Sequence, residues 1–292
     1  MKLGVSFLSI SAIAAALILL SCQAGSQPSS QPGAQGQTSP HAYLGFDLNI
    51  FPGKEALPVL RKTFAFSSYW LSPPPGEKNN TWVGNGQREA LQSQGFGFLL
   101  LYRGPLSREL KNEAAAVQRG TLDARAAASV AKSEGFPAQA IIFLDVEEGG
   151  RLSAAYHAYL RAWTAELSRA GYRSGAYCSG MPVKEEPGAT ITTADDIRAH
   201  APSADFIYFI FNDACPPSPG CTYPPNPPSP AAGGIPYASV WQYAQSPRRK
   251  ELTAHCAPGY HTDGNCYAPG DTAHAWLLDI DSAASPDPSS GR

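Results

Sequence analysis

The sequence contains little charge, and the two signs nearly balance. Only 16% of its 292 residues are Asp, Glu, Lys or Arg, against roughly 25% in an average globular protein. With 22 basic and 24 acidic residues, the chain has no surplus of positive charge, which argues against nucleic-acid binding. No glycine-rich phosphate loop, serine nucleophile elbow or dinucleotide fingerprint occurs. The sequence therefore gives no support to a kinase, an esterase or a dehydrogenase.

Long apolar runs are scarce too, apart from one at the N-terminus. Lys2 precedes an apolar stretch from Val5 to Leu20 that ends in Leu-Leu-Ser-Cys at Cys22. This order is typical of an export signal. The cysteine resembles that of a bacterial lipobox, which implies cleavage before Cys22 and acylation of its thiol. An ordinary secretory signal with a coincidental cysteine is the alternative. We expect residues 1–22 to be a lipoprotein signal peptide that anchors an exported protein in the bacterial cell envelope.

Two polar segments flank the expected folded region. Residues 23–40 contain no charge and no apolar residue larger than alanine, so they cannot bury enough surface to fold. We interpret this segment as a disordered tether. Residues 283–292 have a similar composition and are expected to form a disordered tail. The folded domain is therefore expected over residues 41–282.

Short runs rich in aromatic and β-branched residues, bounded by turn formers, predict eight strands. They are Ala42–Asp47, Phe64–Leu71, Phe96–Gly104, Ala140–Glu148, Arg173–Gly180, Asp205–Asn212, Ala238–Gln245 and Trp276–Ser282. Helical patterns alternate with the earlier strands, at Gly53–Thr63, Arg88–Gln94, Asp123–Glu134, Ser153–Ala170 and Thr193–His200. This alternation predicts an α/β fold with a parallel sheet, and eight strands favour a (β/α)8 TIM barrel. In the last third, long loops take the place of helices.

Four cysteines lie in these late loops. Cys215 and Cys221 belong to one loop, and Cys256 and Cys266 to the next. In an exported protein such pairs are most simply two local disulfides. The alternative is a metal site that combines Cys256 and Cys266 with nearby histidines at 255, 261 and 274. No CxxC or HExxH spacing supports it, so we expect neither a metal nor a cofactor.

The strongest chemical signal is a pair of carboxylates after an apolar strand. In Phe-Leu-Asp-Val-Glu at 143–147, Asp145 and Glu147 are two residues apart, so they share one face, about 6–7 Å apart at the backbone. The carboxyl ends of barrel strands are where active sites form. Two neighbouring carboxyls push each other's pKa values apart, leaving one protonated and one ionised. Glycosidic cleavage needs that division of roles.

Further acids follow the first and last predicted strands. Asp47 ends the first strand, while Asp279 and Asp281 end the last as a pair on one face. In a closed barrel these two strands are neighbours, so Asp47 and Asp279 are expected to join Asp145 and Glu147. An acidic cluster could alternatively hold a cation such as Ca²⁺.

Aromatic and amide side chains on other strands suggest sugar contacts. Rings can stack on the C–H faces of sugars, and amides and hydroxyls can bind sugar OH groups. We expect substrate contacts from the following residues: Tyr102, Tyr177, Trp241, Gln242, Tyr243 and Asp281.

Several motifs occur in an order that resembles a known family. They are GFD at 45–47, FLDVE at 143–147, GAYCSG at 175–180, WQY at 241–243 and LDID at 278–281. The series is similar to that of family 25 lysozymes. It resembles more closely their relatives, the glycoside-hydrolase-like TIM-barrel domains once called domain of unknown function 1906.

The resemblance implies a TIM barrel whose carboxylates face a glycan. It implies Glu147 as general acid, with Asp145 either orienting an N-acetyl group or acting as base. Asp47 and Asp279 would complete the acidic floor. The implied substrate is the β-1,4 linkage of peptidoglycan. We therefore expect a monomeric, lipid-anchored glycosidase that does not bind nucleic acid, with a non-catalytic glycan-binding barrel as the alternative.

Overall fold

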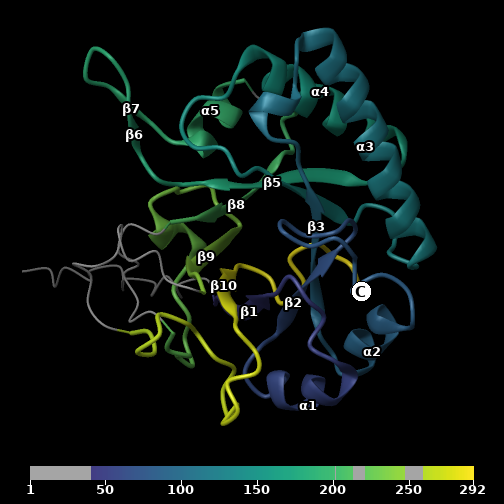
Figure 1. Ribbon diagram of the computed structural model, residues 1–292, viewed down its shortest axis with the longest axis vertical. Helices are drawn as coiled ribbons and strands as arrows, with labels where there is room; N and C mark the ends of the chain where they lie inside the picture. The colour runs from purple at the N-terminus through teal and green to yellow at the C-terminus, as the bar shows by residue number, and fades with distance from the viewer. Residues whose placement is uncertain (1–40, 201, 213–220, 247–258) are drawn as a thin grey trace, which may run out of the picture. The chain divides into compact units, whose positions relative to one another are not determined.

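Eight strands form a closed barrel in the computed structural model, which describes residues 41–200, 202–212, 221–246 and 259–292 (Figure 1). The strands are β1 (Tyr43–Asp47), β2 (Phe66–Trp70), β3 (Gly97–Arg103), β4 (Ile141–Asp145), β5 (Arg173–Ser179), β8 (Ile207–Phe211), β9 (Val240–Ala244) and β10 (Asp279–Ala283). Their order around the barrel is β1-β10-β9-β8-β5-β4-β3-β2. A separate two-stranded hairpin, β6 (Val183–Lys184) and β7 (Thr190–Ile191), projects beyond β5. The predicted TIM-barrel-like fold is confirmed.

Helices follow the earlier strands and become sparse later. They are α1 (Leu57–Leu60), α2 (Gln87–Ser93), α3 (Glu113–Ser133), α4 (Ala154–Arg169) and α5 (Thr193–Ala199), with 3₁₀ turns η1 (Lys54–Ala56), η2 (Ser107–Glu109) and η3 (Pro230–Gly233). Between β8 and β10 the described residues contain the η3 turn and no α-helix, as the sequence predicts. None of the described helices is long and apolar enough to cross a membrane.

The two longest helices, α3 and α4, pack side by side on the outside of the barrel (Figure 1). The hydroxyl of Ser153 caps α4 by accepting a hydrogen bond from the backbone N–H of Tyr156 at 3.2 Å. Helix α3 begins at Glu113, directly after its cap residue Asn112 and ten residues before the predicted start at Asp123. Asp123 instead lies within the helix, where its carboxylate accepts hydrogen bonds from Arg119 and Tyr159. Its side chain therefore joins α3 to α4.

The last strand runs against the expected direction. β10 is antiparallel to both neighbours, β1 and β9, whereas the sequence analysis predicted a parallel sheet throughout. Parallel neighbours need a crossover connection, usually a helix, and the described residues between β9 and β10, 245–246 and 259–278, contain no α-helix. Asp279 consequently begins its strand instead of ending it. It still pairs with Asp47, so the two carboxylates meet at the same end of the barrel.

The prediction of local disulfides is wrong for the two cysteines that the structure describes. Cys221, after β8, is bonded to Cys266, which precedes β10, across a separation of 45 residues. Cys215 and Cys256 lie outside the described residues. The two loops lie side by side, with the N–H of Cys221 donating to the carbonyl of Gly259. Because Cys266 is in this disulfide, it is not a metal ligand. Sequence spacing alone could not show that the loops meet.

The segment after β10 is packed, in contrast to the disordered tail that its composition suggests. Asp287 accepts a hydrogen bond from the N–H of Phe98 at 2.8 Å, and the hydroxyl of Ser289 accepts one from Leu100 at 2.8 Å. The carbonyl of Ser289 accepts the N–H of Ile141, where β4 begins. Ser289 is fully buried. The polar side chains therefore satisfy strand N–H groups that have no neighbouring strand at that point.

Candidate active site

A pocket of about 160 Å³ opens at the carboxyl end of the parallel strands. Because strand side chains alternate between faces, the inward residue at each strand end contributes to its lining. The lining residues are Asp47, Asn49, Trp70, Pro75, Leu101, Asp145, Glu147, Tyr177, Gln242, Gln245 and Asp279. The pocket thus brings together six of the residues that the sequence analysis selected: Asp47, Asp145, Glu147, Asp279, Tyr177 and Gln242.

Three of the predicted sugar contacts lie on the outer face of the barrel. Tyr102 packs on Trp163 of α4, with ring centroids 5.3 Å apart. Trp241 and Tyr243, on either side of Gln242, are both buried, and the hydroxyl of Tyr243 donates to the carbonyl of Thr222. The WQY motif therefore presents only its glutamine to the pocket. The sequence analysis chose these rings by residue type and did not apply the two-residue alternation of a strand.

Asp145 and Glu147 share the pocket but differ in exposure. Asp145 is only 2% exposed, whereas Glu147 is open to solvent. Burial and the neighbouring carboxylate of Glu147 raise the pKa of Asp145 well above its ordinary value, while Arg103 acts in the opposite direction. Within the described part of the chain, no ion pair holds Glu147. Asp145 is therefore the carboxyl whose protonated form burial favours, and Glu147 is the carboxyl that a ligand can reach.

Asp47 and Asp279 form the adjacent wall of the pocket. Trp70 donates its indole N–H to Asp47 at 3.2 Å. Burial raises the pKa of Asp47 to about 6, although hydrogen bonds from Ser68 and Trp70 favour its charged form. Asp279 is half-buried and accepts the backbone N–H of Ser246. Asp47 thus changes charge close to physiological pH.

Asp281 is separate from this lining. It is fully buried opposite Gly45, and neither carboxyl oxygen has a hydrogen-bond partner among the described residues. Burial, together with the charges of Asp47 and Asp279, raises its pKa well above the ordinary value. The structure therefore does not place Asp281 where the sequence analysis expected a substrate contact.

Three polar side chains that line the pocket are hydrogen-bonded to one another. Tyr177 donates its hydroxyl to Gln242 at 2.8 Å, and the amide of Gln245 donates to both, at 3.1 and 2.8 Å. The Tyr177 ring also stacks on Phe211, with centroids 5.1 Å apart. The sequence analysis missed Gln245, which directly follows its strand. A glutamine at a strand end is the only signal that could have suggested it.

The pocket continues into a larger groove of about 440 Å³. The two share Asp47, Asn49 and Asp279, and the groove adds the aromatic side chains of Phe51 and Trp276. The sequence analysis included Trp276 in a strand and did not select it or Asn49 as site residues. The site is therefore a cleft of two adjoining parts, with Asp47 and Asp279 shared between them, Asp145 and Glu147 in the smaller part and Phe51 and Trp276 in the larger.

One known family matches part of the chain. Residues 71–208 match the family described as Rv2525c-like, glycoside hydrolase-like domain. Residues 71–208 are thus similar to a glycoside hydrolase-like domain. The resemblance drawn from the ordered motifs is confirmed at this level. A search of curated proteins found no match.

Solved structures share the barrel. An uncharacterized protein from B. stearothermophilus aligns with a TM-score of 0.54 and 20% identity, over 82% of this chain and 95% of that one. The Tat-secreted protein Rv2525c from Mycobacterium tuberculosis aligns with a TM-score of 0.48 and 15% identity, over 85% and 97%. The spore cortex lytic enzyme SleM from Clostridium perfringens aligns with the same score and identity, over 85% and 69%. At 20% identity, the first of these shows a common fold.

Proposed function

We propose that this protein hydrolyses O-glycosidic bonds of a cell-envelope glycan such as peptidoglycan. The observation that carries the proposal is the contrast between two carboxyls in one pocket. Asp145 is buried and its pKa is raised, whereas Glu147, two residues later, is exposed at the same pocket. Glycosidases obtain their acid and base from carboxyls that the environment separates in this way. The match to a glycoside-hydrolase-like family supports the same reaction.

The roles follow from the surroundings of each group. Glu147 is the general acid, because it is the carboxyl of the pair that reaches the cleft. Asp145 supports Glu147 from the buried side of the pocket, where burial and the neighbouring carboxylate raise its pKa well above the ordinary value. Asp47, whose pKa is about 6, is ionised at neutral pH and is positioned to receive a proton from water.

Recognition of the glycan uses the rest of the cleft. The amides of Gln242 and Gln245 and the hydroxyl of Tyr177 bind sugar hydroxyls. Trp276 in the adjoining groove provides an apolar surface for a sugar ring. The pocket of about 160 Å³ and the adjoining groove of about 440 Å³ together suit several consecutive sugars of a polymer better than a single free sugar.

The cellular location is part of the proposal. The N-terminal segment reads as an export signal, and the Cys221–Cys266 disulfide suits an oxidising compartment. We propose that the protein acts outside the cytoplasm as a monomer, attached to a membrane through a lipid on Cys22. In that location its substrate would be a neighbouring envelope glycan.

The release of reducing ends from purified peptidoglycan tests the reaction. The Glu147→Gln variant removes the acid proton and keeps the side-chain shape, so we expect at least a ~100-fold loss of activity. Glu113→Gln, the same change at an exposed residue of α3, is the matched control and should keep full activity.

A different pattern would favour the alternative. If no reducing ends are released by the wild type, while it and Glu147→Gln both bind insoluble peptidoglycan, the protein is a non-catalytic glycan-binding barrel. Equal hydrolysis by the wild type and Glu147→Gln would overturn the assignment of Glu147.

A further inference from the structure

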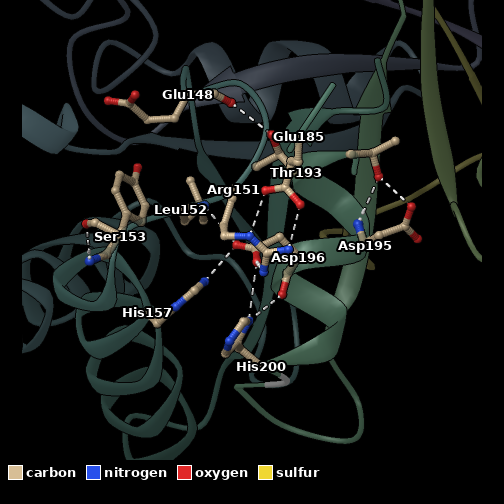
Figure 2. A network of polar contacts seen from close by, with 12 residues as sticks. Glu148, Arg151, Leu152, Ser153, His157, Glu185, Thr193, Asp195, Asp196 and His200 are labelled. Atoms are coloured by element: carbon tan, nitrogen blue, oxygen red, sulfur yellow. Dashed lines mark hydrogen bonds and ion pairs between the residues drawn. The ribbon is translucent and has the colours of Figure 1, made fainter. Parts of the chain in front are cut away.

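A second cluster of polar side chains lies outside the cleft, between α4 and α5 (Figure 2). His157 comes from α4, and Asp196 with the C-terminal cap residue His200 comes from α5. Asp196 and His200 are four residues apart, so a helix places them on the same face. Figure 2 shows the two imidazoles turned toward the Asp196 carboxylate from opposite elements. Three side chains with metal-binding atoms therefore converge here.

The distances suit a shared ion. His157 Nε2 lies 2.7 Å from one oxygen of Asp196, and His200 Nδ1 lies 3.4 Å from the other. One ligand atom from each of the three residues lies within 4.8 Å of the other two. Ligand atoms in a tetrahedral Zn²⁺ site are about 3.3 Å apart, since each bond is roughly 2.0–2.1 Å. His200 Nδ1 now lies 2.9 Å from the backbone carbonyl oxygen of Asp196, and an ion would take the place of that contact.

The two carboxylate oxygens of Asp196 differ in their contacts: those to Oδ2 are short, and those to Oδ1 are long. Asp196 Oδ2 accepts the N–H of Leu152 at 2.9 Å as well as the His157 contact. The nearest donors to Oδ1 are more distant: Arg151 at 3.3 Å and His200 at 3.4 Å. Arg151 makes its short contacts with Glu185 instead, at 2.7 and 2.8 Å. An ion at Oδ1 can therefore displace the long contact while Arg151 stays paired with Glu185.

We propose that His157, Asp196 and His200 bind a divalent transition-metal ion of the Zn²⁺ class. Two imidazoles and one carboxylate are a ligand set that such ions prefer. The His200 side chain is 41% exposed, which gives an ion access from solvent and leaves a fourth position for water. The sequence analysis expected no metal, because it examined only the histidines near the late cysteines. The bound ion would join α4 to α5, and the site does not depend on the glycan reaction.

Cobalt titration of the purified, metal-free protein tests this site. Co²⁺ should bind at one equivalent with the strong visible absorption of a four-coordinate ion, and Zn²⁺ should remove that absorption. In His200→Ala we expect Co²⁺ affinity to fall at least ~10-fold. Zn²⁺ should also raise the melting temperature of the wild type but not of His200→Ala, because an ion stabilises only the state that binds it.

The matched control is His274→Ala. His274 lies beside His261, with ring centroids 4.6 Å apart, in a second histidine pair of the described residues. This variant should bind Co²⁺ as the wild type does. The melting temperature without metal shows that each variant is folded. Unchanged Co²⁺ absorption in folded His200→Ala, loss of absorption in His274→Ala instead, or no binding to the wild type would each overturn the site.

Discussion

The buried carboxyl of Asp281 links a single residue to the pH dependence of stability. Its folded pKa is raised well above the ordinary value of 3.8, because the group is buried without a hydrogen-bond partner among the described residues. Above pH 4 the unfolded chain loses this proton while the folded protein keeps it. Stability therefore decreases as the pH rises, until the folded pKa is reached. The limiting slope for one proton is about 1.4 kcal/mol per pH unit.

Asp281→Asn should remove this contribution. The free energy of unfolding of the variant minus that of the wild type should increase from pH 4 to pH 7. The value of this difference at pH 4 does not affect the prediction. Urea unfolding at several pH values measures the difference. If the difference in the free energy of unfolding between Asp281→Asn and the wild type did not change with pH, a raised pKa of Asp281 would be contradicted. Asp47 and Asp145 also have raised pKa values, so part of the slope should remain in the variant.

Among the elements of the fold, the two late loops depend on the Cys221–Cys266 disulfide. It closes a loop of 45 residues where no α-helix is described. The chain-entropy account assigns such a bond about 4 kcal/mol of stability. We expect the double variant Cys221→Ser, Cys266→Ser to lose up to that amount in urea unfolding. A loss below about 1 kcal/mol would show that the loops are held by other contacts.

Strand positions could be predicted from sequence, but strand direction could not. The eight apolar runs coincide with the barrel strands because strand burial leaves a pattern in local composition. The direction of β10 depends on the path from β9, which composition does not record. Asp279 was nevertheless assigned correctly to the end of the barrel that holds Asp47, because reversing the strand moved the residue from its end to its start.

At the scale of the whole molecule, residues 284–292 complete the barrel wall. Asp287 accepts hydrogen bonds from the N–H groups of Phe98, Gly291 and Arg292 at 2.8, 3.1 and 3.1 Å. Asp287→Ala leaves all three without this acceptor, so we expect a loss of about 2 kcal/mol in urea unfolding. Asp205→Ala, an exposed aspartate, is the control and should stay within about 0.5 kcal/mol of the wild type. Equal stability of the two variants would contradict a structural role for the segment.

The candidate site illustrates what composition can and cannot indicate. Acids after apolar strands are conspicuous, and Asp47, Asp145 and Glu147 were selected for that reason. Gln245 and Asn49 reach the pocket from loops, whose course depends on tertiary packing. The His157–Asp196–His200 cluster requires two helices to meet, so no local pattern in the sequence indicates it.

The pairing of β1 with β10 also determines when the barrel can close. A chain that emerges from its N-terminus exposes β1 with one unpaired edge until residues 279–283 are available. The N–H groups at the starts of β3 and β4 obtain their hydrogen-bond acceptors still later, when residues 287–289 are available. The native barrel therefore forms only after residues 279–289 have been synthesised. Until then β1 keeps one unpaired edge, which is open to pairing with other chains.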